Sequence, residues 1–87
     1  MKKIEISLKT HDGFFTEGKW IFKHFEVSDE DTPNLWMVNF RGPKIEVNVY
    51  FDSGAHHDVS FGVSVNKVKQ LSARDLSTGY SLFSLQF

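Results

Sequence analysis

Four histidines close to carboxylates are the residues of this sequence best suited to acid–base or metal chemistry. A metal site needs three or four converging ligands, and its histidines are typically one helical turn apart or two positions apart in a strand. His56 and His57 are adjacent instead, so in an extended chain they point to opposite faces. We therefore predict no metal site and no cofactor. The alternative is a site assembled across loops from His57, Asp58 and His11.

Catalytic signatures are few. The sequence has no Gly-x-Ser-x-Gly turn, no glycine-rich phosphate loop and no cysteine that could act as a nucleophile. A histidine beside an arginine could cleave RNA, because general acid–base catalysis needs little more than two positioned groups. Nothing in the sequence places Arg41 or Arg74 beside a histidine. We therefore predict that the chain is not an enzyme.

Aromatic residues are the most informative excess, with nine Phe, two Trp and two Tyr in 87 residues. Alternation along the predicted strands assigns Phe51, Phe61, Phe83 and Phe87 to the core. It leaves other large side chains on outer strand faces, and these form a candidate partner-binding surface: Trp20, Phe22 and Tyr50, with Met37 and His24 near them. Exposed aromatic residues and methionine are enriched at protein interfaces. The alternative is a second small core that covers them.

An acidic run, Asp29, Glu30 and Asp31, falls in a predicted loop and joins the candidate surface. Short charge runs are usually solvated, and the sharper hypothesis is that this loop meets a basic partner. The net charge of −1 gives no overall basic excess of the kind that nucleic-acid-binding domains usually carry.

Two alternating runs define the elements that would position these residues. Residues 44–51 and 58–66 each place apolar side chains at every second position, and the loop between them carries Asp, Ser and Gly. This pattern predicts a β-hairpin with one buried and one exposed face. Further strands are expected at 2–9, 19–27, 35–40 and 80–87, with a turn at Asp12-Gly13 and a bulge or bend near Gly18.

Residues 67–76 break the alternating pattern. Val68 and Leu71 fit helical spacing, with Asn66 as a candidate N-cap and Gly79 just beyond the end, so a short helix or a single helical turn is expected before the last strand. The predicted fold is therefore mainly β: one domain over residues 1–87, an antiparallel meander of about six strands curled into a barrel or compact sandwich.

The composition predicts a soluble, cytoplasmic protein. The chain has no cysteine, which suits a reducing compartment, and its start has neither a signal peptide nor an apolar stretch that would cross a membrane as a helix. We expect no membrane partner. A homodimer formed by pairing of exposed strand edges is possible from the sequence.

Two functions remain after these exclusions. The first is a non-catalytic protein-binding domain, such as an inhibitor or immunity-type protein, that docks a partner through the aromatic face and the acidic loop. The second is single-stranded nucleic-acid binding on the same face, with bases stacked on the aromatic residues and phosphates held by Lys19, Lys23 and Lys44.

Overall fold

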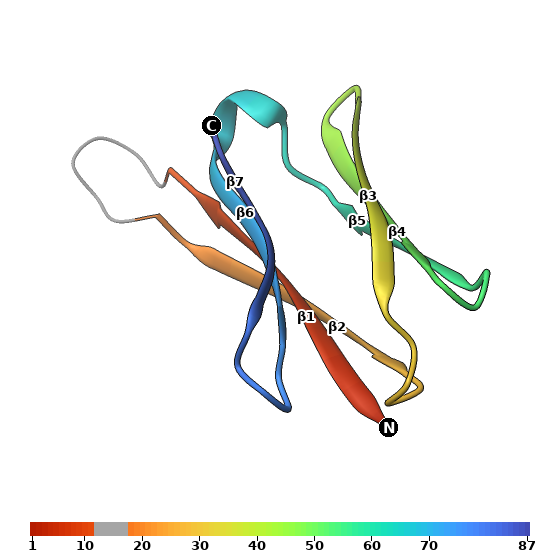
Figure 1. Ribbon diagram of the computed structural model, residues 1–87. Helices are drawn as coiled ribbons and strands as arrows, with labels where there is room; N and C mark the ends of the chain where they lie inside the picture. The colour runs from red at the N-terminus through yellow and green to blue at the C-terminus, as the bar shows by residue number, and fades with distance from the viewer. Residues whose placement is uncertain (12–17) are drawn as a thin grey trace.

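The computed structural model describes residues 1–11 and 18–87, and these form mainly β-strands (Figure 1). The prediction of a mainly β, antiparallel chain is confirmed, and the predicted turn at Asp12-Gly13 lies outside the described residues. One 3-10 turn, η1, accompanies seven strands. The elements are β1 (Lys2–Thr10), β2 (Trp20–Val27), β3 (Pro33–Arg41), β4 (Lys44–Phe51), β5 (His56–Phe61), η1 (Val65–Lys67), β6 (Val68–Asp75) and β7 (Ser81–Gln86).

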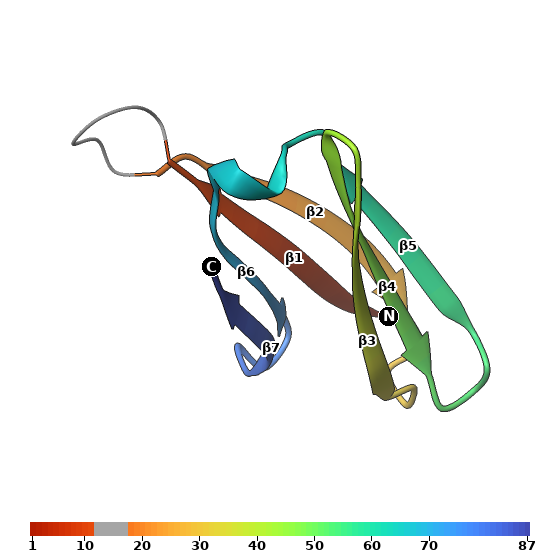
Figure 2. The same ribbon diagram turned by 90° about the horizontal axis from the view of Figure 1, so that it is seen from above.

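The strands form two antiparallel sheets rather than one continuous meander. A four-stranded sheet has the order β2-β1-β6-β7, and a three-stranded sheet has the order β3-β4-β5. The predicted central hairpin is present as β4 and β5. Strand β1 pairs with β2 on one side and with the distant β6 on the other, so the first and last thirds of the chain share one sheet. Figure 2 shows the two sheets as separate groups of strands.

The helix expected over 67–76 is wrong, because Val68–Asp75 is strand β6 in the interior of the four-stranded sheet. Only the turn η1 just before it is helical. The helical spacing of Val68 and Leu71 is coincidental, since Leu71 and Ala73 also alternate and both lie buried. Pairing with β1 and β7 satisfies the backbone of β6 on both sides, which outweighs a weak local preference. Gly79, with φ of 77°, closes the turn into β7 instead of capping a helix.

The core lies between the inner faces of the two sheets. Ile6 and Leu8 of β1 and Leu71 of β6 pack in one cluster with Val47 of β4 and Phe61 of β5. These side chains are at most 2% exposed. The alternation that the sequence predicts for β1 and β4 is therefore the alternation of core-facing and outward-facing residues in the structure. Outward-facing Glu5, Ser7 and Asn48 are nevertheless at most 8% exposed.

Aromatic contacts link the margins of the two sheets. Trp36 of β3 stacks on Phe83 of β7 with ring centroids 5.4 Å apart, and Phe25 of β2 stacks on His57 of β5 at 4.5 Å. Phe83 is partly buried as a result. Phe87 is 45% exposed and packs edge-on against Phe40, which is itself 49% exposed; this corrects its assignment as a core residue.

A close backbone approach just before β2 requires glycine at position 18. A Cβ at Gly18 would lie 1.8 Å from the carbonyl oxygen of Thr10, whereas a Cβ at Gly62 would meet open space. We expect Gly18→Ala to lower the free energy of unfolding by about 1–3 kcal/mol, because the β1 and β2 ends must move apart. Urea denaturation measures this loss. Gly62→Ala is the matched control, and an equal loss in both variants would contradict the explanation.

Candidate binding surfaces

The structure divides the predicted surface residues between the two sheets. Trp20, Phe22 and His24 alternate along β2 and lie on the outer face of the four-stranded sheet, with Trp20 opposite Lys9 and His24 opposite Glu5 of β1. Met37 and Tyr50 lie on the outer face of the three-stranded sheet. The two sheets pack by their inner faces, so these outer faces point in opposite directions. One continuous surface through all five residues does not exist.

The outer face of the four-stranded sheet, here called the Trp20 face, presents a pair of aromatic rings. Trp20 is 39% and Phe22 49% exposed, and their rings stack with centroids 6.1 Å apart and an interplanar angle of 15°. The ammonium group of Lys9 lies 5.4 Å from the Trp20 ring centre, within cation–π range. The second core proposed as an alternative does not cover these rings.

A nearly buried carboxylate lies beside the aromatic pair. The side chain of Glu5 is only 9% exposed although it is on the outer face. Its Oε2 lies 2.9 Å from Nε2 of His24, and its Oε1 accepts hydrogen bonds from Nε of Arg74 at 3.1 Å and from Oγ of Ser7 at 3.2 Å. Burial raises the pKa of Glu5, but the hydrogen bonds from His24 and Ser7 and the charge of Arg74 outweigh it and hold that pKa below its usual range.

Glu5 brings together two residues that sequence reasoning left apart. His24 and Arg74 are separated by fifty positions, yet both contact this one carboxylate. The proximity of His24 and Arg74 was not predicted because residues 67–76 were interpreted as helical, which hid the pairing of β1 with β6. Both Glu5 oxygens already contact neighbouring side chains, Oε2 that of His24 and Oε1 that of Arg74. The role of the carboxylate in this cluster is therefore to hold Arg74 and His24 in place. A shallow depression beside it is lined by Glu5, Ser7, Trp20, Phe22, Ser72 and Arg74.

The outer face of the three-stranded sheet, here called the Tyr50 face, is a different kind of surface. Tyr50 stacks on His56 with ring centroids 5.6 Å apart, and Met37 is exposed nearby on β3. Its centre is a polar network in which Asn48 donates to Asp58 at 2.6 Å and accepts from Asn39 at 2.8 Å. The exposed apolar residues of this face are Leu35, Met37 and Tyr50, and Met37 pairs with Asn48 at the polar centre.

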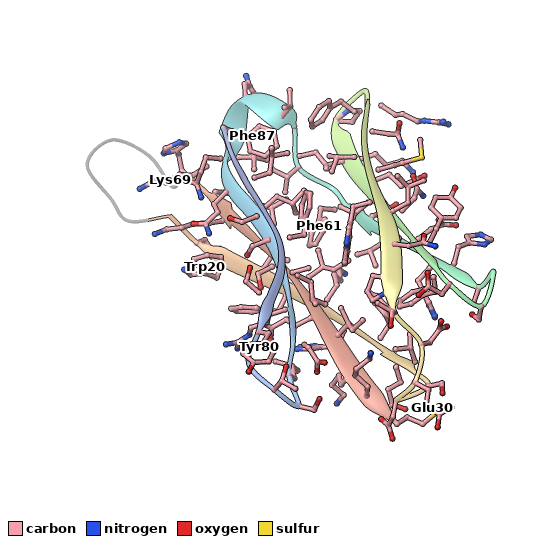
Figure 3. All side chains as sticks on the ribbon, viewed as in Figure 1. Trp20, Glu30, Phe61, Lys69, Tyr80 and Phe87 are labelled. Carbon is pink, nitrogen blue, oxygen red and sulfur yellow. The ribbon has the colours of Figure 1, made fainter. Side chains whose placement is uncertain are left out.

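The acidic loop lies at the end of β2 that is opposite to Trp20. Seven residue steps of extended strand, about 23 Å, separate Trp20 from Val27, where the loop begins. Figure 3 shows Trp20 and Glu30 well apart. Asp31 accepts hydrogen bonds from the hydroxyl and amide of Ser53, and the Ser53 hydroxyl is the main cause of a lowered Asp31 pKa. Asp29 lies 3.9 Å from the N-terminal amine. Glu30 is exposed.

The histidines considered for metal binding have other partners. His57 lies between the sheets against Phe25 and Phe51, while Asp58 points outward to Asn48. Within residues 1–11 and 18–87, no three histidine or acidic side chains are placed to hold a metal ion.

A larger hollow than the depression beside Glu5 lies elsewhere, at the end of the sheets where β2 begins. Ile21, Val63 and Pro43 give it apolar walls, and Lys19 and Lys67 lie at its margin. None of the predicted surface residues lines it.

Comparison with models of known protein families, with curated proteins and with solved structures gave no match to this chain. No helix in the described part of the chain is long and apolar enough to cross a membrane.

Proposed function

We propose that the chain is a compact two-sheet sandwich that acts as a non-catalytic protein-binding domain, of the inhibitor or immunity type, and docks its partner through the Trp20 face. The observation that carries this proposal is the exposed, stacked Trp20–Phe22 pair beside Arg74, which Glu5 holds in place. The cysteine-free composition supports a reducing compartment such as the cytoplasm.

The residue types and their rigidity favour the Trp20 face over the Tyr50 face. Tryptophan and arginine are the residues that most often dominate binding energy at interfaces. A sheet strand holds Trp20 and Phe22, and one hydrogen bond from Nε to Glu5 restrains the 54% exposed side chain of Arg74, so less conformational entropy is lost on binding. The depression between these side chains offers room for a side chain of the partner.

The acidic loop contributes to association rather than to the central contact. Asp29 and Glu30 are exposed at the far end of β2, near the limit of what a partner centred on Phe22 would cover. Charges at the rim of an interface mainly change the association rate. The loop therefore supports a partner that is basic on the corresponding side.

Replacing Trp20 by alanine tests the proposal. We expect Trp20→Ala to weaken the complex roughly thirtyfold or more, which corresponds to the loss of about 2 kcal/mol expected of a central aromatic contact. The partner is identified by photo-crosslinking through a photoreactive phenylalanine analogue at position 22, and its affinity is then measured by calorimetry. Tyr50→Ala is the matched control on the opposite face, and its affinity should be unchanged.

Two outcomes would contradict this assignment. Loss of binding in Tyr50→Ala with full binding in Trp20→Ala would move the interface to the Tyr50 face. Unfolding of Trp20→Ala, seen by circular dichroism, would mean that Trp20 stabilises the fold; Phe22→Ser would then carry the binding test, because Phe22 is the more exposed of the pair.

Single-stranded nucleic acid is a second candidate, favoured by the position of Lys9 over the Trp20 ring. Stacked aromatic rings with cations at their margin are the usual platform for unpaired bases. Of the lysines first considered for phosphates, Lys23 alternates with the aromatic residues on β2 and Lys44 belongs to the other sheet. Lys19 lies at the separate hollow with Ile21. Lys9 and Arg74, which lie on the Trp20 face, support this function better.

A titration with fluorescent oligonucleotides distinguishes the two candidates. If nucleic acid is the partner, oligothymidine binds at 20 mM salt, the affinity falls steeply as salt rises, and Lys9→Gln reduces the salt dependence. Absence of any anisotropy change at low salt, with the protein folded, would exclude this candidate.

A further inference from the structure

The two sheets have four edge strands, and only three of them carry the features that normally prevent strands from pairing with other chains. Charged residues and proline are among the features that protect free edges. Strand β2 has Lys23 and Glu26 within it, β3 has Pro33 and Arg41 at its two ends, and β5 contains Asp58. Strand β7 is the fourth edge, and among the described residues it pairs with β6 alone.

Strand β7 has none of these protections. Its sequence, Ser-Leu-Phe-Ser-Leu-Gln, contains no charged residue and no proline, and no charged residue occurs anywhere after Asp75. A free edge of this composition is a template for another strand. The turn before it adds Tyr80, which is exposed.

Exposed apolar side chains lie along the same margin. Leu85 and Phe87 point to the inner side of the sheet, because Leu85 pairs with the buried Leu71, and they remain exposed where the two sheets part. Phe40 of β3 contacts Phe87 edge-on, with ring centroids 5.9 Å apart, and is 49% exposed. Figure 3 shows Phe87 near the C-terminal end of β7. Whatever pairs with β7 would also cover this strip.

We propose that a second copy of this chain pairs with β7 in antiparallel orientation, so that two four-stranded sheets join into one of eight strands about a two-fold axis at Ser84. In this register Ser84 lies opposite Ser84 of the second copy, and Phe83 lies opposite Leu85. Residues that lie opposite each other thus have their side chains on the same face of the joined sheet, as antiparallel pairing requires.

Charge is what selects a second copy as the occupant. When the same strand of two copies pairs about a two-fold axis, each side chain near the axis lies close to the same side chain of the second copy. A charged residue there would face a residue of the same charge and be repelled by it. Pairing β2 with itself would bring lysines or glutamates together, and pairing β5 with itself would do the same to Asp58. Strand β7 meets no such repulsion, and the apolar strip of one copy covers that of the other.

This dimer is independent of the proposed function. Strand β7 and strand β2, which carries Trp20, are the two opposite edges of the four-stranded sheet. The dimer therefore leaves the Trp20 face of each copy open, and failure of either proposal does not affect the other.

Single cysteines provide the test, because the chain has no native cysteine. Side chains directly opposite in an antiparallel pair have Cβ atoms about 4.5–5.5 Å apart, close to the separation in a disulfide. Under mild oxidation we expect Ser84→Cys to give roughly tenfold more cross-linked dimer than Ser60→Cys, given these distances. Ser60 is an exposed serine on edge strand β5 and is the matched control. Equal cross-linking of the two variants would overturn the proposal.

Analytical ultracentrifugation gives the second measurement. The wild-type chain should sediment with twice the protomer mass at high micromolar concentration. Ser84→Lys should sediment as a protomer, because two lysines then face each other at the axis, and Ser60→Lys should remain a dimer. A wild-type protomer at every concentration, an undisturbed dimer in Ser84→Lys, or open-ended assemblies in place of a dimer would each overturn the proposal. Circular dichroism confirms that the variants are folded.

Discussion

Replacing Phe61 by alanine should lower the free energy of unfolding by about 3–5 kcal/mol, the range measured for large aromatic residues in protein cores. Phe61 is 2% exposed and lies in the core cluster contributed by both sheets, opposite Ile45 in the β4–β5 ladder. Its removal would leave a cavity between the sheets that β-strands tied by backbone hydrogen bonds cannot easily collapse to fill. The total free energy of unfolding of a small domain is only about 5–15 kcal/mol, so this variant should be close to unfolded at 37 °C.

Urea denaturation followed by tryptophan fluorescence measures this effect. Phe22→Ala is the matched control, because it makes the same chemical change at a ring that is 49% exposed on the outer face. We expect its loss to be well under half of that for Phe61→Ala. Equal losses in the two variants would mean that the outer ring contributes to folding as much as the core ring does.

Replacing Glu5 by glutamine should have the second largest effect on stability. The carboxylate accepts hydrogen bonds from Arg74 and Ser7 and contacts His24. A neutral amide cannot accept from all three, and removing a buried, charged hydrogen-bond partner costs about 1–3 kcal/mol. The same change frees Arg74, so it should also weaken binding on the Trp20 face.

The pH dependence of stability gives the distinctive signature of Glu5. Because hydrogen bonds and the Arg74 charge hold the Glu5 pKa below its usual range in the folded state, the unfolded chain takes up the proton first as the pH falls. The contribution of Glu5 is therefore complete above the unfolded pKa of about 4.3 and is lost as the pH falls through the folded pKa. In Glu5→Gln the free energy of unfolding should therefore fall less steeply as the pH is lowered; this acidic part of the pH dependence is called the acid limb below.

Glu26→Gln is the control for this measurement. Glu26 is an exposed glutamate on the same outer face, so its replacement should leave the acid limb nearly as steep as in the wild type. A wild-type slope in Glu5→Gln would show that other carboxylates determine the acid response. Asp31 and Asp75, whose pKa values are lowered by hydrogen bonds from Ser53 and Ser77, are the residues to replace in that case.

Local patterns in the sequence were sufficient for most strands. Alternation of apolar and polar residues is a property of neighbours along the chain, so β1, β4 and residues 58–61 of β5 could be read directly, with the side of each strand that faces the core. The strand predicted over 58–66 was misplaced at both ends, because β5 is His56–Phe61. The same alternation put Trp20 and Phe22 on an outer face, where the structure has them.

Strand partners were beyond what local patterns determine. The segment 67–76 has an ambiguous period, and it became a strand because β1 and β7 supply hydrogen bonds on both of its sides. The meander was expected because neighbouring strands usually pair, but β1 reaches across the chain to β6. Contacts between distant segments depend on how the whole chain buries its apolar faces.

The sequence by itself therefore determined which residues could form strands, which faces of those strands are apolar, and that no cysteine chemistry is available. The tertiary structure decided which surface residues are neighbours. It put Trp20 and Tyr50 on opposite faces, and it assembled Glu5, His24 and Arg74 into one cluster. The physical reason is that side-chain direction follows from the local backbone, whereas proximity follows from strand pairing between residues far apart in the chain.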